Sequence, residues 1–204
     1  MTNDALFERL KHPNPNLREK AMIELAENQD ENTIPRLMSI LAAEDMTYRR
    51  AAVKALGVIG FEAVPSLVDS LANSDNPTIR ASCTKALAQV AVNYHDDPFP
   101  NEGIKGLKSA IADENPVVNV AAVMALGAIG SPVLDVLIES LRTTDNVAVS
   151  VAIINALGSI ADPKSAEILN NLAEDNSVDT YVQESAKSAL SRLEMVGKFQ
   201  GGQP

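Results

Sequence analysis

The chain has 204 residues, of which 46% are hydrophobic, 22% are charged and only 3% are aromatic, with no tryptophan. Its net charge of −10, from 17 basic and 27 acidic residues, opposes the negative phosphate backbone and therefore disfavours nucleic-acid binding. The single cysteine excludes an internal disulfide. The first residues lack the basic segment and apolar run of a signal peptide, and no apolar stretch reaches 18 residues. We therefore expect a cytoplasmic protein without a membrane span.

One phrase recurs along the chain: residues 49–60 read RRAAVKALGVIG and residues 119–130 read NVAAVMALGAIG. With weaker copies included, its central leucine recurs at intervals of 31, 31, 39, 31 and 33 residues, at Leu25, Leu56, Leu87, Leu126, Leu157 and Leu190. A fixed period of roughly 20–50 residues is typical of repeat proteins. We therefore predict an all-α fold, a right-handed superhelical α-solenoid of about six HEAT-like repeats over residues 1–194. The Gly/Gln-rich end, residues 195–204, is expected to be a disordered tail.

Each repeat is predicted to contain two helices, which in the second repeat span residues 33–42 and 47–59. The first helix of a repeat has one apolar stripe, because leucines recur four residues apart. The second helix begins with an Asn cap followed by Pro, at Asn14-Pro15, Asn76-Pro77 and Asn115-Pro116. It ends at Gly60 or Gly130, where glycine permits a left-handed cap. Glycines three residues earlier, such as Gly57, predict close packing between neighbouring helices.

The third interval is eight residues longer than the usual 31, which is the length of the segment NYHDDPFP at residues 93–100. Insertions in solenoids form loops on one face, often the binding face. We expect this loop to overhang the middle of the concave groove that the solenoid would form. The insertion also divides the charge unevenly. Residues 1–92 carry 10 basic and 12 acidic groups, whereas residues 93–204 carry 7 and 15.

The phrases AVPSL at residues 63–67 and ALGVIG at residues 55–60 resemble the HEAT-like repeat of phycobilisome lyases, and the resemblance covers roughly residues 3–194. The chain is similar to the cyanobacterial E/F-type bilin lyases and their chaperone-like relatives, including the small Z-type members of phycoerythrin biogenesis. This resemblance implies a bilin lyase subunit, or a non-catalytic chaperone, that aids covalent attachment of a linear tetrapyrrole to a phycobiliprotein cysteine.

The implied partners are a phycobiliprotein subunit and a second lyase-like HEAT subunit. The phycobilin is then a substrate or ligand, and no permanently bound cofactor is expected. HEAT repeats of the same kind also occur in non-enzymatic adaptors, for example in iron–sulfur assembly. A protein-binding adaptor therefore remains the alternative function.

A basic series marks the start of the second helices, at Arg18, Arg49 and Arg80. In a structural interpretation these arginines bond to acidic groups of the preceding turn, such as Asp45 or Asp75. In a functional interpretation Arg49, Arg50 and Arg80 line a concave surface and bind the carboxylates of a bilin, whose geometry suits guanidinium groups. Arg50 is the better functional candidate, because its counterparts Ala81 and Val120 are apolar.

The aromatic and insertion residues supply the remaining candidates for bilin or partner binding. Tyr48 either fills an inward apolar position, like its counterparts Ile79 and Val118, or stacks on a flat ligand. Within the insertion, Asp96 and Asp97 could accept hydrogen bonds from pyrrole nitrogens, and His95 could move a proton near neutral pH. The alternative is an ordinary solvated loop. The candidates in the insertion are Tyr94, His95, Asp96 and Asp97.

The remaining chemistry-bearing residues predict no catalytic site. Most residues at the repeat positions equivalent to Cys83 are alanines, so we interpret Cys83 as a buried core residue. The resemblance implies no need for a nucleophile here, because in bilin attachment the reacting thiol belongs to the acceptor. His12 and His95, the two histidines, fall in distant repeats, so no metal site is expected. No phosphate-binding glycine loop and no catalytic triad is present, and catalytic residues stay unassigned.

Overall fold

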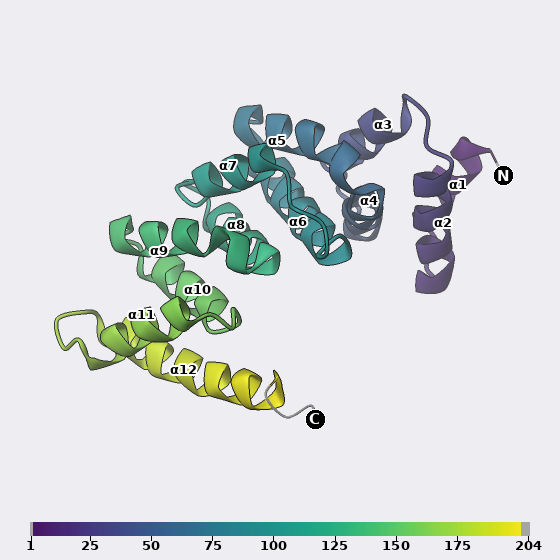
Figure 1. The fold of residues 1–204 in the computed structure, drawn as a ribbon. Helices are drawn as coiled ribbons and strands as arrows, with labels where there is room; N and C mark the ends of the chain where they lie inside the picture. Colours follow the sequence, from purple (N-terminus) through teal and green to yellow (C-terminus); the bar gives the residue numbers. More distant parts are fainter. Residues whose placement is uncertain (1, 201–204) are drawn as a thin grey trace. The chain divides into compact units, whose positions relative to one another are not determined.

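The predicted repeats form six pairs of helices in the computed structural model, which describes residues 2–200 and the side chains of residues 2–195 (Figure 1). Over these residues the chain contains α-helices and short 3-10 helices, without a strand. The first helices are α1 (Asn3–Arg9), α3 (Thr33–Ile40), α5 (Val64–Asn73), α7 (Asn101–Ala110), α9 (Leu134–Thr143) and α11 (Pro163–Glu174). The second helices are α2 (Pro15–Glu27), α4 (Met46–Ile59), α6 (Pro77–Asn93), α8 (Pro116–Ile129), α10 (Val147–Leu157) and α12 (Thr180–Gln200). The all-α repeat fold is thus confirmed.

The chain divides into two compact units, residues 1–110 and residues 111–204. In the first unit α4 packs between α2 and α6, and in the second α10 packs between α8 and α12. Helix α12 continues to Gln200, so the predicted tail is helical up to this residue. Residues 201–204 lie outside the described part of the chain.

The helix starts follow the predicted Asn-Pro signal. The side-chain oxygens of Asn14, Asn76 and Asn115 each accept a hydrogen bond from the backbone N–H two residues later, at 2.9–3.0 Å. Asp45 caps α4 in the same way, at 2.8 Å from the N–H of Thr47. A side-chain cap of this kind stabilises a helix by about 1 kcal/mol.

Gly60 and Gly130 end α4 and α8 with φ angles of 85° and 81°. Their ψ angles of −139° and −142° differ from the left-handed helical cap that we expected. The pair instead occupies the extended positive-φ region that is essentially restricted to glycine. This conformation turns the chain into the short helices η1 (Gly60–Ala63) and η2 (Ser131–Val133), which lead into the next repeat.

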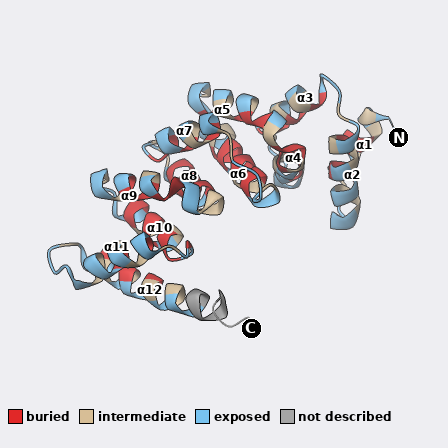
Figure 2. Cartoon of the chain, in the orientation of Figure 1, coloured by how far each residue is buried: buried red, intermediate tan, exposed pale blue. Residues whose placement is uncertain are grey.

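Buried side chains concentrate on the second helices of the repeats (Figure 2). The recurring leucines Leu25, Leu56, Leu87, Leu126 and Leu157 are all completely buried. Close helix packing accompanies them. A Cβ atom on Gly57 would lie 2.3 Å from Cγ of Gln89, and one on Gly158 would lie 2.8 Å from Cβ of Ala189. The predicted close approach between neighbouring helices is therefore present in both units.

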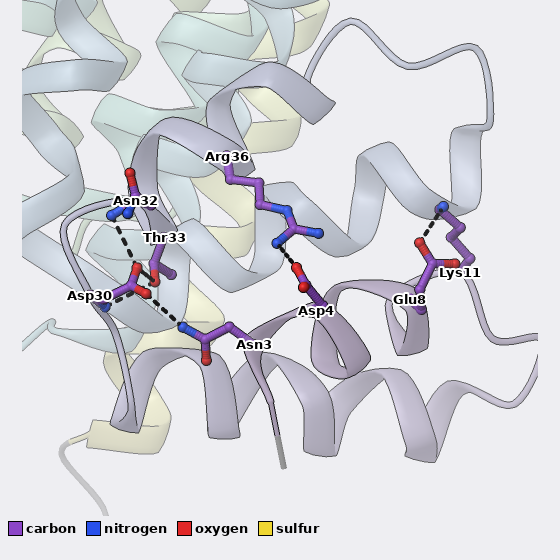
Figure 3. A network of polar contacts seen from close by, with 8 residues as sticks. All are labelled: Asn3, Asp4, Glu8, Lys11, Asp30, Asn32, Thr33 and Arg36. Atoms are coloured by element: carbon purple, nitrogen blue, oxygen red, sulfur yellow. Dashed lines mark hydrogen bonds and ion pairs between the residues drawn. The ribbon is translucent and has the colours of Figure 1, made fainter.

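Polar contacts hold α1 against the second repeat (Figure 3). Arg36 on α3 pairs with Asp4 at 2.5 Å, and its guanidinium lies 4.0 Å from the ring centre of Phe7. Asn3 donates to Asp30 at 2.9 Å. The hydroxyl of Thr33 also donates to Asp30, and this bond is the main reason that the pKa of the Asp30 carboxyl lies below its usual range. The Asp30 contribution to stability is therefore lost as the pH falls through that lowered pKa.

One segment, Met46–Asn73, has the length and composition of a membrane span. It is not one continuous α-helix, because η1 and the positive-φ Gly60 separate α4 from α5. Half of its most apolar window is buried inside the fold. Core packing of the second and third repeats accounts for the buried half of this window.

The thiol of Cys83 is expected to be inert in the folded protein. It is buried on α6, and this burial raises its pKa to about 12. Because the thiolate is the reactive form, iodoacetamide at pH 8 should label Cys83 only after unfolding in urea, as followed by mass spectrometry. Rapid labelling of the native protein would contradict the buried assignment. Stability should fall as the pH rises from about 9 to 12, since the unfolded thiol ionises first.

Candidate functional site

A groove of about 500 Å³ lies along the second helices of the first unit, between α2, α4 and α6. This volume falls within the roughly 300–1,000 Å³ that is typical of small-molecule sites. Its lining mixes apolar and polar side chains. The apolar members include Met22, Ile23, Ala51 and Val58, and the polar or charged members are Arg18, Glu19, Thr47, Arg50, Lys54, Gln89 and Asn93.

The groove is basic although the protein as a whole is acidic. Three cations, Arg18, Arg50 and Lys54, face one carboxylate, Glu19. Thr47, Arg50 and Lys54 lie three and four residues apart, which places them on one face of α4. Among the residues that the structure describes, neither Arg50 nor Lys54 has an ion-pair or hydrogen-bond partner. Both cations are therefore available to an anionic ligand.

The basic series at the start of the second helices has a structural role. The Nη1 atoms of Arg18, Arg49 and Arg80 donate to backbone carbonyls six residues earlier, those of His12, Ala43 and Ser74. Asn119 donates to the carbonyl of Asp113 from the same repeat position. The partner of Arg49 is thus a carbonyl rather than the expected Asp45, whose carboxylate caps α4 instead. This recurring bond joins α2, α4, α6 and α8 to the turn that precedes each of them.

Arg49 and Arg80 do not line the groove, and neither does Tyr48. The ring of Tyr48 is half-buried and lies 4.9 Å from the ammonium of Lys11, which follows α1. Burial is the main reason that the pKa of Tyr48 lies above its usual range. The geometry at Tyr48 therefore favours the packing interpretation of this residue.

The insertion begins as an extension of α6 and caps the end of α4. The side-chain amide of Asn93 donates to the carbonyl of Gly57 at 2.9 Å, and the hydroxyl of Tyr94 donates to that of Val58 at 2.6 Å. Both carbonyls belong to the last turn of α4, where helical partners are missing. The Tyr94 ring also packs against Phe61, with ring centres 5.3 Å apart. Tyr94 thus fixes one wall of the groove without lining it.

The remaining candidates of the insertion lie in solvent. His95, Asp96 and Asp97 are exposed, and Nε2 of His95 lies 3.3 Å from a carboxylate oxygen of Asp96. Asn93 is the one member of residues 93–100 in the described groove lining. Nowhere in the described part of the chain do three or more His, Cys, Asp or Glu side chains gather as metal ligands.

Of the residues predicted from the sequence, the structure brings Arg50 alone into the described groove. Arg18 was predicted only as a member of the structural series, and Lys54, Gln89 and Asn93 were not singled out. The spacing of Arg50 and Lys54 by one helical turn could have indicated a shared cationic face. Gln89 and Asn93 gave no signal, because their position depends on the packing of α6 against α4.

Replacing Tyr94 with phenylalanine is expected to lower the free energy of unfolding by about 1 kcal/mol, because the Val58 carbonyl loses its donor. Urea unfolding of the Tyr94→Phe protein measures this loss. The matched control is Tyr181→Phe, since the Tyr181 side chain is 65% exposed, and this change should be close to neutral. Equal stability of the two variants would contradict the capping role of Tyr94.

Comparison with known proteins places the chain among repeat proteins. The family model described as HEAT repeats matches residues 3–88 and 104–191. The chain is 51% identical over 199 residues to an uncharacterized phycocyanin operon protein Z of Pseudanabaena tenuis, covering 98% of both chains. It is 39% identical over 131 residues to the bilin biosynthesis protein CpeZ of a Synechococcus strain, covering 61% of this chain and 70% of that protein.

Two solved structures share the fold. The complex of CpcE and CpcF of phycocyanin lyase from a Nostoc strain matches 76% of this chain and 96% of that chain, with a TM-score of 0.50 and 21% identity. A designed armadillo repeat protein matches 95% of this chain and 100% of that chain, with a TM-score of 0.53 and 16% identity. At these identities the likeness concerns the fold alone. Together with the sequence relatives, it confirms the resemblance carried by the repeat phrases.

Proposed function

Because the chain belongs to the HEAT-repeat family of the phycocyanin operon protein Z, we propose that it has an accessory role in attaching bilins to phycobiliproteins. In this role the groove of the first unit holds a linear tetrapyrrole. The bilin is a transient ligand, and the acceptor is a phycobiliprotein subunit in the cytoplasm. The name of the CpeZ relative and the fold shared with a phycocyanin lyase complex support this proposal.

The single observation that carries the proposal is the pair of unpartnered cations on α4. A linear tetrapyrrole has two propionate groups, and guanidinium binds carboxylate through two parallel hydrogen bonds. Arg50 and Lys54 lie one turn apart in a groove that also has apolar walls, Met22 and Val58 among them. The groove therefore offers cations for the propionates and apolar surface for the pyrrole rings.

The groove contributes positioning rather than a nucleophile. The only thiol of the chain is buried on α6 with a raised pKa, so the attacking thiol comes from the acceptor protein. Holding the pigment extended and oriented toward that thiol converts a bimolecular reaction into an effectively unimolecular one. A protein that positions the pigment but supplies no nucleophile fits the role of an accessory subunit that acts with a second lyase-like HEAT subunit.

Absorbance spectroscopy with purified pigment tests the proposal. Titrating the protein into phycocyanobilin or phycoerythrobilin should give a red-shifted and more intense band, because a held tetrapyrrole is extended. Serum albumin serves as the control for unspecific pigment binding. A spectrum that the protein leaves unchanged would refute bilin binding and favour the adaptor function. Co-expression with an acceptor subunit, with and without a partner lyase, then separates a sufficient enzyme from an accessory protein.

A further inference from the structure

The second unit contains its own groove of about 500 Å³, formed by α8 and α10. It lies at the same place in the repeat as the groove of the first unit. Position by position, Val120 and Met124 replace Glu19 and Ile23, while Val151 and Asn155 replace Arg50 and Lys54. The repeat geometry is thus kept, but no ionisable side chain lines this groove.

The loss of charge extends over both helices. Neither α8 nor α10 contains a single Asp, Glu, Lys or Arg. Large apolar side chains on these helices nevertheless reach solvent, since Met124 is 66% exposed, Val117 is 53% exposed and Val147 is 39% exposed. Core packing cannot explain apolar side chains that it leaves uncovered. Of these three residues Met124 lines the groove itself, and an exposed large apolar side chain at a groove is typical of an interaction site.

Small residues line the remainder of the groove, namely Gly127, Ala148, Ala152, Ala156 and Ser159. Small side chains allow another backbone to come close, and an amphipathic helix that lays its apolar face into such a groove is a common mode of peptide recognition. No cation lines this groove, and the guanidinium of Arg192 on α12 is already bonded to Oδ1 of the lining residue Asn155 at 2.6 Å. The groove therefore lacks the unpartnered cations that would bind the carboxylates of a pigment. The second groove is therefore suited to a different ligand from the first.

The charges of the second unit indicate what should flank the apolar face of the occupant. Residues 111–204 carry 12 acidic and 5 basic groups. Asp145 precedes the cap of α10, one turn before the groove residue Ala148, and its exposed carboxylate has no partner in the described part of the chain. An approaching helix with Lys or Arg beside its apolar face would be attracted, whereas one with carboxylates would be repelled.

From these observations we infer that the groove between α8 and α10 docks an amphipathic helix of a partner protein, with an apolar face bordered by basic residues. Met124 supplies the exposed apolar contact, and Asp145 pairs with a basic flank. The inference does not depend on bilin binding, because pigment and helix occupy grooves in different units.

A labelled synthetic helix tests the inference on the full chain by fluorescence anisotropy. The probe is a peptide longer than about 15 residues, with leucines at i, i+3, i+4 and i+7 spacing and lysines on both flanks. A second peptide carries glutamates in place of the lysines. Saturable binding of the first peptide and none of the second is expected. Met124→Lys should weaken binding about tenfold, as for a central apolar contact.

Met46→Lys is the matched control, because Met46 is 52% exposed and lies on α4 outside both grooves. It changes the net charge equally and should leave the affinity unchanged. Equal weakening by both variants, equal affinity for both peptides, or no binding would overturn the inference. So would a wild-type dimer that Met124→Lys converts to a monomer in sedimentation, because the occupant would then be a second copy of this chain. Matching thermal unfolding curves exclude misfolding of either variant.

Discussion

Replacing Arg50 with alanine is expected to weaken bilin binding about tenfold to a hundredfold, since a hydrogen bond to a charged group contributes about 1.5–3 kcal/mol. The double variant with Lys54→Ala should bind more weakly still, because both propionates then lose their cations. Titration of pigment absorbance against each variant measures the two dissociation constants. Stability should change little, as the Arg50 side chain is exposed and has no partner among the described residues.

Arg142→Ala is the matched control for this experiment. Arg142 is also exposed, but it lies on α9 in the second unit and lines neither groove. Its removal lowers the positive charge equally and should leave pigment affinity unchanged. A stable Arg50→Ala protein that binds pigment like the wild type would argue against the first groove as the site. A lowered melting temperature with intact affinity would instead give Arg50 a structural role.

Leu56→Ala and Leu126→Ala are each expected to lower the free energy of unfolding by about 2–5 kcal/mol. Both leucines are completely buried in the last turn of α4 and of α8. Truncating either leucine leaves a cavity. The helices already pack closely at the neighbouring glycines, so they cannot move together to fill it. Urea unfolding followed by far-UV circular dichroism measures the loss for each unit.

The control for the leucine variants is Val92→Ala, because Val92 is an exposed apolar residue on α6. This change should cost less than about 0.5 kcal/mol. Comparable losses for Val92→Ala and Leu56→Ala would contradict the assignment of the recurring leucine to the core. Cys83→Ala should lie between these limits, since it removes one buried atom from a column of small residues.

The repeat fold could be predicted from the sequence because its determinants are local and recur. The leucine at each repeat, the Asn-Pro starts and the glycines after the second helices act within a few residues of their own position. Predicted residues 47–59 became Met46–Ile59, a difference of one residue. The left-handed cap at Gly60 was wrong in detail, because the ψ angle depends on how η1 leads into the next repeat.

The candidate site could be predicted only in part. Arg50 was distinguished by being unlike its repeat counterparts, and the structure places it in the groove lining; its role in binding stays a prediction. Arg49, Arg80 and Tyr48 were equally conspicuous in the sequence, yet the two arginines bond to backbone carbonyls and the Tyr48 ring packs against Lys11. Which face of a helix becomes a groove depends on the neighbouring helices, and no single repeat contains that information.

The sequence by itself determined the helices, their caps and the two-helix repeat, because period and capping are properties of short segments of chain. Only the tertiary structure decided which cations remain without partners and which apolar side chains remain uncovered. The physical reason is that partners and burial come from residues far apart in the chain. Gln89 and Asn93 reach the groove from α6, and Tyr94 supports it by bonding to α4. The two units form a groove by the same helix packing. One groove is basic and the other has an uncharged lining because different side chains stand at equivalent repeat positions.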